Sequence, residues 1–219
     1  MLSYQYDFSN MSLEILILII ILIFSVVIHE VSHGYVANLL GDPTARLQGR
    51  LTLNPIKHLD PVGSIVIPAL LVLTSSPFLF GWARPVPYNP YNFQKGGKWG
   101  EALVAGAGPA VNIFLALLFA LILHVFGSTS PAFFKLGFAV VYINVMLAIF
   151  NMIPIPPLDG SKVLSAILPV SLGLQYDRFR SMLEFNPFLG FGIVILFIVL
   201  FGSSFAQFVI GFSRLLVGM

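Results

Sequence analysis

The stretch that decides the fold is LEILILIIILIFSVVIHEVSHGYVANLL, residues 13–40. Apart from Glu14 and Ser25, residues 13–28 are apolar, and one crossing of a lipid bilayer needs about 20 such residues. The run continues through His29-Glu30-Val31-Ser32-His33 to Leu40, and Gly41-Asp42-Pro43 then supplies the glycine and proline that typically end a helix. We therefore predict one continuous membrane-spanning helix that carries a polar motif within it.

The composition places the rest of the chain in a membrane as well. Of its 219 residues, 58% are hydrophobic and 9% are charged, whereas soluble domains carry about 25% charged residues. The net charge is only +2, and the basic residues lie in loops between apolar runs, so no nucleic-acid partner is expected. The chain contains no cysteine, which leaves His, Asp and Glu as the side chains that can bind a metal.

Four more apolar runs follow the first one, at residues 64–80, 102–126, 133–153 and 188–212. The run at 64–80 differs from the others because it contains two prolines, Pro68 and Pro77, and the polar stretch Thr74-Ser75-Ser76. Broken segments of this kind are tolerated at membrane depth where protein covers them. We predict an all-α integral membrane protein with four full transmembrane helices plus a re-entrant hydrophobic segment at 64–80; five or six full spans are the alternative.

The positions of the basic residues decide the topology. They lie in the loops on either side of the 64–80 run and after the 133–153 run: Arg46, Arg50, Lys57, Arg84, Lys95, Lys98, Lys162, Arg178 and Arg180. Basic loops stay in the cytoplasm, and these loops share that side only if 64–80 enters the bilayer and returns. We therefore expect the N-terminus outside, and a single polytopic domain over residues 1–219.

Two histidines and a glutamate interrupt the first span in the pattern His29-Glu30-x-x-His33, an HExxH motif. On a helix, residues i and i+4 lie on one face about 6 Å apart, which suits two imidazoles that bind one tetrahedral zinc ion. Glu30 is placed to act as a general base on a water molecule at the metal. The alternative is a buried histidine pair without a metal, but ionisable groups within a span are costly and usually functional.

A third protein ligand is expected because hydrolytic zinc keeps three of them and one open position. Asp159 is the only other acid at the end of an apolar span, and Pro154, Pro156 and Pro157 unwind the backbone just before it. In the predicted topology the first span and the 133–153 span are parallel, so Asp159 and the two histidines can meet at one depth. A helix-terminating turn is the alternative role of Asp159.

Several motifs in order along the chain resemble one family. HEVSH at 29–33 and NMIPIPPLDG at 151–160 look like the paired signature of the site-2 protease family of intramembrane zinc metalloproteases, peptidase family M50. GPAVN at 108–112 is similar to the family's Gly-Pro-x-x-Asn. FGWARPV at 80–86 is similar to a segment of the minimal bacterial and archaeal branch, which lacks PDZ and CBS domains. The resemblance covers about residues 20–165.

The resemblance implies a role for each matching residue. His29, His33 and Asp159 would bind one Zn²⁺ per chain, and Glu30 would be the catalytic acid/base. The catalytic core would extend over about residues 13–165, followed by the C-terminal span at about 188–212. The active site would lie toward the cytoplasmic side of a prokaryotic cell membrane.

Two asparagines and one further histidine are less sharply defined. Asn151 and Asn112 would hold the substrate backbone or the tetrahedral oxyanion, since an amide can donate to developing negative charge. A hydrogen bond between helices is the alternative for both, and it applies equally to Asn144. His58 is expected at the wet membrane interface, with a metal role as its alternative.

The expected function is zinc-dependent hydrolysis of a peptide bond in or near a transmembrane segment of a membrane-protein substrate, as in regulated intramembrane proteolysis. The lipid bilayer and a substrate with a transmembrane helix are the expected partners. The alternative is a non-proteolytic membrane zinc carrier or scaffold, which has no need of a base such as Glu30. The substrate, the signalling pathway and the oligomeric state stay open.

Overall fold

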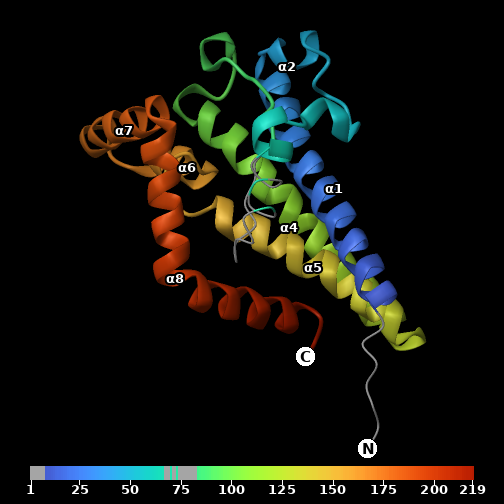
Figure 1. Ribbon diagram of the computed structural model, residues 1–219. Helices are drawn as coiled ribbons and strands as arrows, with labels where there is room; N and C mark the ends of the chain where they lie inside the picture. Colours follow the sequence, from blue (N-terminus) through green and yellow to red (C-terminus); the bar gives the residue numbers. More distant parts are fainter. Residues whose placement is uncertain (1–7, 67–69, 71–72, 74–82) are drawn as a thin grey trace, which may run out of the picture.

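The computed structural model describes residues 8–66, 70, 73 and 83–219 (Figure 1). Its regular structure there is helical throughout, without a strand. The main helices are α1 (Phe8–Leu40), α2 (Thr44–Leu47), α4 (Gly100–Phe126), α5 (Pro131–Asn151), α6 (Asp159–Ile167), α7 (Val170–Phe185) and α8 (Pro187–Leu216). Short helical turns lie between them at Pro55–His58, Pro61–Val66, Pro90–Asn92, Gly97–Trp99 and Gly127–Thr129.

Within the described residues, four helical stretches are long and apolar enough to cross a membrane: Ile15–Leu40, Gly97–Thr129, Pro131–Asn151 and Phe188–Leu216. They correspond to four of the five apolar runs, so the prediction of an all-α integral membrane protein is confirmed. The fifth run, 64–80, lies mostly outside the described residues. Whether it re-enters or spans therefore stays a prediction.

Helix α1 is one continuous helix that contains the polar motif near its C-terminal end. The side chains of its first half are exposed around the helix, as expected of a surface that faces lipid: Leu13, Ile15, Leu16, Leu18, Ile19, Ile20, Leu22, Ile23 and Phe24. The helix ends where the sequence predicts, because Gly41 takes a φ of +113° that few other residues tolerate.

Helix α4 lies between α1 and α5 and packs against both (Figure 1). Every fourth residue along its central stretch is buried, and most of these residues are small: Val104, Gly108, Asn112, Ala116 and Ala120. Small side chains let membrane helices approach closely, which gives van der Waals contact where no hydrophobic force drives association. Lower on the same face, Ala116, Ala120 and Leu123 join Val141 and Val145 of α5 in a common core.

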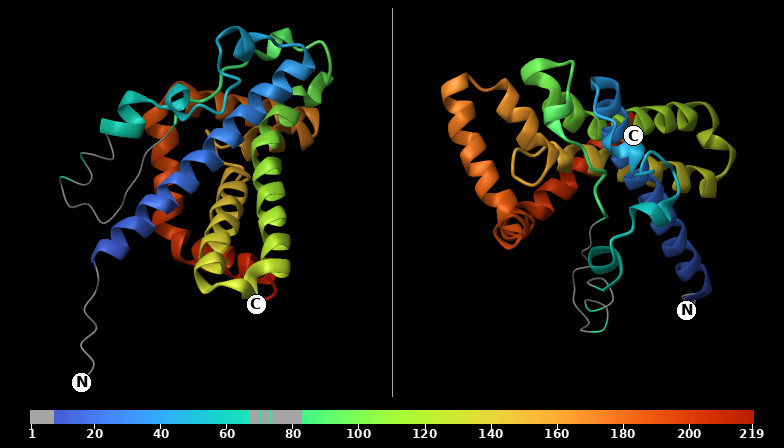
Figure 2. Two further views of the ribbon diagram at one scale, coloured as in Figure 1. Left: turned by 90° about the vertical axis from the view of Figure 1, so that its right-hand side faces the viewer. Right: turned by 90° about the horizontal axis from the view of Figure 1, so that it is seen from above.

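Helix α8 has two arms separated by a sharp bend (Figure 1). The C-terminal arm packs against α5, where Phe205, Val209 and Phe212 belong to or border the same core. Helices α2, α6 and α7 and the segment from residue 83 to the start of α4 gather at one end of the bundle, opposite the turn that joins α4 to α5 (Figures 1 and 2). The polar part of the molecule is therefore concentrated at a single end.

The contact between α4 and α5 gives a testable consequence. A Cβ atom on Gly137 of α5 would lie 2.6 Å from Leu123 Cδ2, whereas one on Gly211 of α8 would meet no atom within 4 Å. Gly137→Leu should lower the thermal unfolding midpoint in detergent by about 3–10 °C, because overpacking costs about 1–3 kcal/mol. Gly211→Leu is the matched control and should leave the midpoint nearly unchanged. Equal midpoints for the two variants would contradict the packing described.

Candidate metal centre

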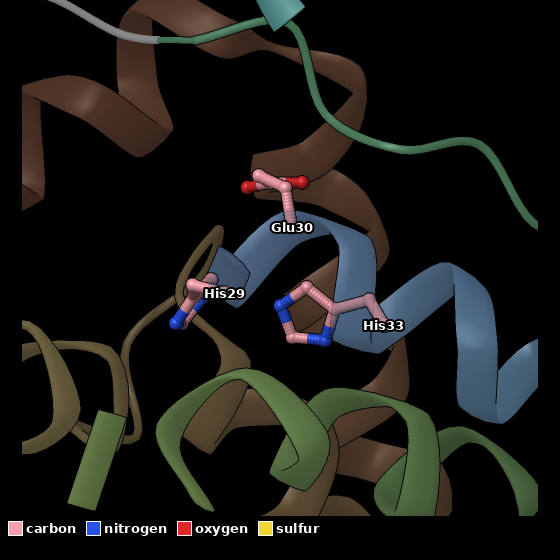
Figure 3. A group of neighbouring side chains, drawn as sticks. All are labelled: His29, Glu30 and His33. Atoms are coloured by element: carbon pink, nitrogen blue, oxygen red, sulfur yellow. The ribbon is translucent and has the colours of Figure 1, made fainter. Parts of the chain in front are cut away.

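His29 and His33 stand one turn apart on the same side of α1 (Figure 3). Both side chains are buried, at 5% and 7% exposure, although histidine is a polar residue within a membrane span. Their ring centroids are 4.7 Å apart and the rings are nearly perpendicular, at 86°. This orientation leaves the Nε2 atoms of both rings free to face a common point.

Each imidazole is fixed by a hydrogen bond from its other ring nitrogen. His29 Nδ1 donates to Asn112 Oδ1 at 2.5 Å, because an amide oxygen can only accept. His33 Nδ1 donates to the carbonyl oxygen of Val104 at 2.7 Å. Both acceptors lie on α4. A proton held on Nδ1 leaves the lone pair of Nε2 available to a metal, and histidine ligands usually donate their other ring N–H to a protein acceptor in this way.

Asp159 completes a set of three donor atoms. Its Oδ2 lies 3.2 Å from His29 Nε2 and 3.3 Å from His33 Nε2. Zinc–ligand distances of about 2.0–2.1 Å in a tetrahedron place neighbouring ligand atoms about 3.3–3.4 Å apart. The same Oδ2 is buried without a hydrogen-bond partner, and such an atom is costly unless something else binds it. The three side chains therefore fit a zinc ion.

The backbone before Asp159 places this carboxylate. Helix α5 ends at Asn151, and a non-helical, proline-rich segment leads to the start of α6 at Asp159. The first turn of α6 packs tightly against the end of α5, since a Cβ atom on Gly160 would lie 2.2 Å from the carbonyl oxygen of Met152. Only glycine fits there. The Asp-Gly pair thus joins a candidate ligand to the one residue type that allows this tight approach to the end of α5.

Asp159 is held in its ionised form. Burial works against the charged carboxylate, but the neighbouring imidazoles of His29 and His33 outweigh burial and lower the pKa of Asp159 below its ordinary value. A carboxylate and two imidazoles are a donor set that zinc hydrolases use.

Glu30 lies beside the histidines and points elsewhere. One oxygen of Glu30 falls within the same 4.8 Å group as the imidazole nitrogens, so Glu30 competes with Asp159 as a third ligand. However, its Oε2 accepts a hydrogen bond from the backbone N–H of Val86 at 2.9 Å. Figure 3 shows Glu30 projecting from α1 away from the two rings. The geometry favours Asp159 as the ligand and leaves Glu30 next to the site.

The extended segment that binds Glu30 is anchored by a buried arginine. Arg50 is 6% exposed, and its Nη2 donates to the carbonyl oxygens of Arg84 and Pro85 at 2.8 and 3.2 Å. Val86, which follows them, packs onto α1: a Cβ atom on Gly34, one turn beyond Glu30, would lie 2.6 Å from Val86 Cγ1. Arg50 and the packing of the Val86 side chain therefore hold the backbone N–H that binds Glu30. The sequence analysis assigned this role to neither residue.

Asn112 and Asn144 belong to a buried hydrogen-bond network between helices, whereas Asn151 lines the cavity at the candidate site. Asn112 is fully buried, and besides accepting from His29 it donates to Asn144 Oδ1 at 2.8 Å. Asn144 in turn donates to Ser25 Oγ at 3.0 Å. This network links α1, α4 and α5, which matches the helix–helix alternative. We interpret Asn112 as a residue that orients His29, since neither end of its amide is free for a substrate.

Asn151 lies at the candidate site itself. A cavity of about 160 Å³ adjoins the three donor atoms and Glu30, and Asn151, Tyr88 and Lys162 are among the residues that line it. The Asn151 amide donates one hydrogen bond to Leu147 of its own helix at 2.9 Å. A contact between the Asn151 amide and substrate stays a prediction.

His58 does not line the cavity at this centre, and its expected exposure to water is wrong. The side chain is only 2% exposed, and its Nε2 donates to the carbonyl oxygen of Thr52 at 2.8 Å. The backbone carbonyl of His58 accepts from Arg84 N–H at 2.8 Å. His58 therefore ties the loop after α2 to the extended segment that holds Glu30.

Known proteins place the chain in a family. A model of peptidase family M50 matches residues 17–133 and 128–196. YwhC of Bacillus subtilis, named as a candidate zinc metalloprotease, is 40% identical over 88% of this chain and 83% of its own length. Rip2 of Mycolicibacterium smegmatis, named likewise, is 31% identical over 62% of this chain and 51% of its own length. The search of solved structures found no match.

The spanning helices, the donor set and these relatives define a multi-pass membrane zinc metalloprotease. The chain belongs to peptidase family M50, the family of the site-2 proteases. The family resemblance of its motifs is thereby confirmed.

Gly108 supplies the room for both imidazoles. A Cβ atom there would lie 2.5 Å from His29 Nε2 and 2.6 Å from His33 Cε1, whereas one on Gly106 would meet nothing within 4 Å. Gly108→Ala should therefore lower zinc affinity at least about tenfold, as for other losses of ligand orientation. Zinc bound by the purified protein against a competing chelator measures the affinity. Gly106→Ala is the matched control, and the same affinity in both variants would show that the site tolerates a wider helix spacing.

Proposed function

We propose that the protein is an intramembrane protease that hydrolyses a peptide bond in or near a transmembrane segment of a membrane-protein substrate. One observation carries this proposal. The donor atoms of His29, His33 and Asp159 converge where spanning helices meet the polar end of the bundle, and Glu30 stands next to them. A peptide hydrolase that acts on membrane-embedded chains needs that combination of depth and polarity.

In this proposal the zinc ligands are His29 Nε2, His33 Nε2 and Asp159 Oδ2. Bound zinc supplies Lewis acidity, which polarises a carbonyl group and makes a water molecule more acidic. Asn112 and the Val104 carbonyl keep both imidazoles in the tautomer that presents Nε2. Both acceptors are buried on α4, so the ligands need little reorganisation before they bind.

Glu30 acts as the general base and then as the general acid. Its carboxylate takes a proton from the attacking water, and the same proton passes to the nitrogen of the leaving amine. The hydrogen bond from Val86 N–H to Oε2 holds the carboxylate in place and leaves Oε1 for the proton. Asn151, which lines the cavity, binds the substrate backbone or the oxyanion.

The proposed orientation follows from charge. Arg46, Lys57, Lys95 and Lys98 lie in the segments between α1 and α4, at the same end as α6 and α7. The turn between α4 and α5 carries no Lys or Arg. The positive-inside rule then places the metal centre toward the cytoplasm and the N-terminus outside, in the cell membrane of a prokaryote. Residues 1–219 form a single polytopic domain, with the catalytic core at about 13–165.

The alternative is a membrane zinc carrier or scaffold with the same ligands. A carrier must release its metal, and it gains nothing from a carboxylate fixed beside the ligands. Glu30 is held there by Val86, and Val86 belongs to a segment that Arg50 anchors. This support for Glu30 favours the protease.

Substitution of Glu30 separates the two functions. Glu30→Gln should abolish cleavage of single-span membrane proteins in reconstituted liposomes, by about 10³-fold or more, because the amide cannot accept the proton. Bound zinc, measured by atomic absorption, should stay at one ion per chain. Chelation should also stop wild-type cleavage, and added zinc should restore it. If Glu30→Gln cleaves like the wild type, or wild type cleaves nothing, the protease proposal fails.

Topology can be tested with single cysteines, since the chain has none of its own. Leu47→Cys, Lys98→Cys and Ser128→Cys place a thiol at exposed positions. A membrane-impermeant thiol reagent applied to intact cells should label only Ser128→Cys, and the other two only after permeabilisation. Labelling of Leu47→Cys and Lys98→Cys from opposite sides would instead show that 64–80 crosses the bilayer.

A further inference from the structure

Lys162 occupies a special position beside the metal centre. It lies one turn after Asp159 on α6 and lines the 160 Å³ cavity at the candidate site. It also lines two further cavities. We call the cavity of about 160 Å³ the inner cavity, the one of about 550 Å³ the middle cavity and the one of about 440 Å³ the outer cavity. Among the residues that line these cavities, Lys162 is the one that all three share.

The three cavities adjoin one another, and we infer one path from the lining residues that they share. The inner and middle cavities share Pro85, Val86, Tyr88 and Pro157, and the middle and outer cavities share Pro90 and Glu101. The path leaves the metal centre between the extended segment after residue 83 and the start of α6. It ends at the surface beside α6 and α7. A substrate chain that reaches the metal centre from this side passes Lys162.

Four charged groups that line the middle and outer cavities are paired with one another: Arg180, Glu101, Asp177 and Glu184. Arg180 Nη2 lies 3.0 Å from Glu101 Oε2, and Arg180 Nε lies 3.6 Å from Asp177 and 3.9 Å from Glu184. These three carboxylates therefore surround one guanidinium. The carboxylate of Asp159 faces the two imidazoles.

Lys162 has no such partner within the part of the chain that the structure describes. Its Nζ lies 5.2 Å from the ring centroid of Tyr88, a cation–π contact. No carboxylate among the described residues forms an ion pair with it. The side chain is partly buried, and a partly desolvated cation attracts an anion more strongly than an exposed one does.

We propose that Lys162 is a specificity-determining residue that binds an Asp or Glu side chain of the substrate, close to the scissile bond. This inference rests on the proposed protease function. The proposal predicts that the substrate is a membrane protein with an acidic residue next to the cleaved peptide bond. The position of Lys162 one turn from Asp159 sets this proximity, and its positive charge sets the sign of the substrate charge that it binds.

A charge-swap experiment tests the proposal. A cleaved single-span substrate is prepared with Asp, Asn or Lys at each position flanking the scissile bond, and kcat/KM is measured for wild type, Lys162→Met and Lys162→Glu. At one flanking position the wild type should favour Asp over Asn by at least about fivefold. Lys162→Met should lose this preference, and Lys162→Glu should favour Lys. Lys98→Met, which alters an exposed cation of the outer cavity, should keep the wild-type preference.

Binding measurements separate this proposal from the protease function. Crosslinking of the same substrates to Glu30→Gln, with and without Lys162→Met, reports charge preference without turnover. A preference for Asp that depends on Lys162 supports the proposal even when no product forms. If Lys162→Met changes zinc content or stability but leaves the Asp/Asn ratio at its wild-type value, Lys162 is a structural cation and the proposal is wrong. If Lys162→Met instead weakens inhibition only by the product with a new carboxyl terminus, the residue binds product and the proposal is also wrong.

Discussion

The close approach of α4 to α1 at Gly108 is the constraint on which the rest of the structure depends. It brings the Asn112 amide and the Val104 carbonyl within hydrogen-bonding distance of the two imidazoles. At a wider spacing both Nδ1 atoms would be buried without acceptors, and unsatisfied polar groups are most costly in a medium without water. The absence of a Cβ atom at Gly108 therefore allows the contacts that determine the tautomer and the orientation of both histidines.

The polar groups inside the membrane helices satisfy one another in sequence. His29 donates to Asn112, Asn112 to Asn144, and Asn144 to Ser25, so that the chain of hydrogen bonds returns to the helix where it begins. Such a network specifies helix register more sharply than apolar packing does, because a shift of one residue leaves buried donors unpaired. The same bonds that orient a ligand thus hold three helices in register.

The parts of the structure that follow from local pattern were predictable from the sequence. The spans follow from apolar runs, the end of α1 from Gly41, and the meeting of Asp159 with the histidines from parallel spans. Contacts between irregular segments were not. Arg50 and Val86 are separated along the chain by residues without periodicity, so nothing in their spacing links them to Glu30.

Other residues remained ambiguous because their chemistry allows two roles. An amide such as Asn112 can donate to a substrate or accept from a histidine, and only the distance to His29 decides between them. His58 lies beside charged residues in the sequence, yet it folds into the loop and is buried. The sequence contains the residue types, whereas the pairing between distant loops is set by the packed structure.

The three donor residues lie far apart along the chain, and this spacing sets the order in which they are synthesised. The two histidines lie on the first spanning helix, and Asp159 follows only after α4 and α5. A nascent chain that has inserted α1 alone carries two of the three donors and neither acceptor from α4. The three donor atoms can therefore come together only after α4, α5 and the start of α6 have been made.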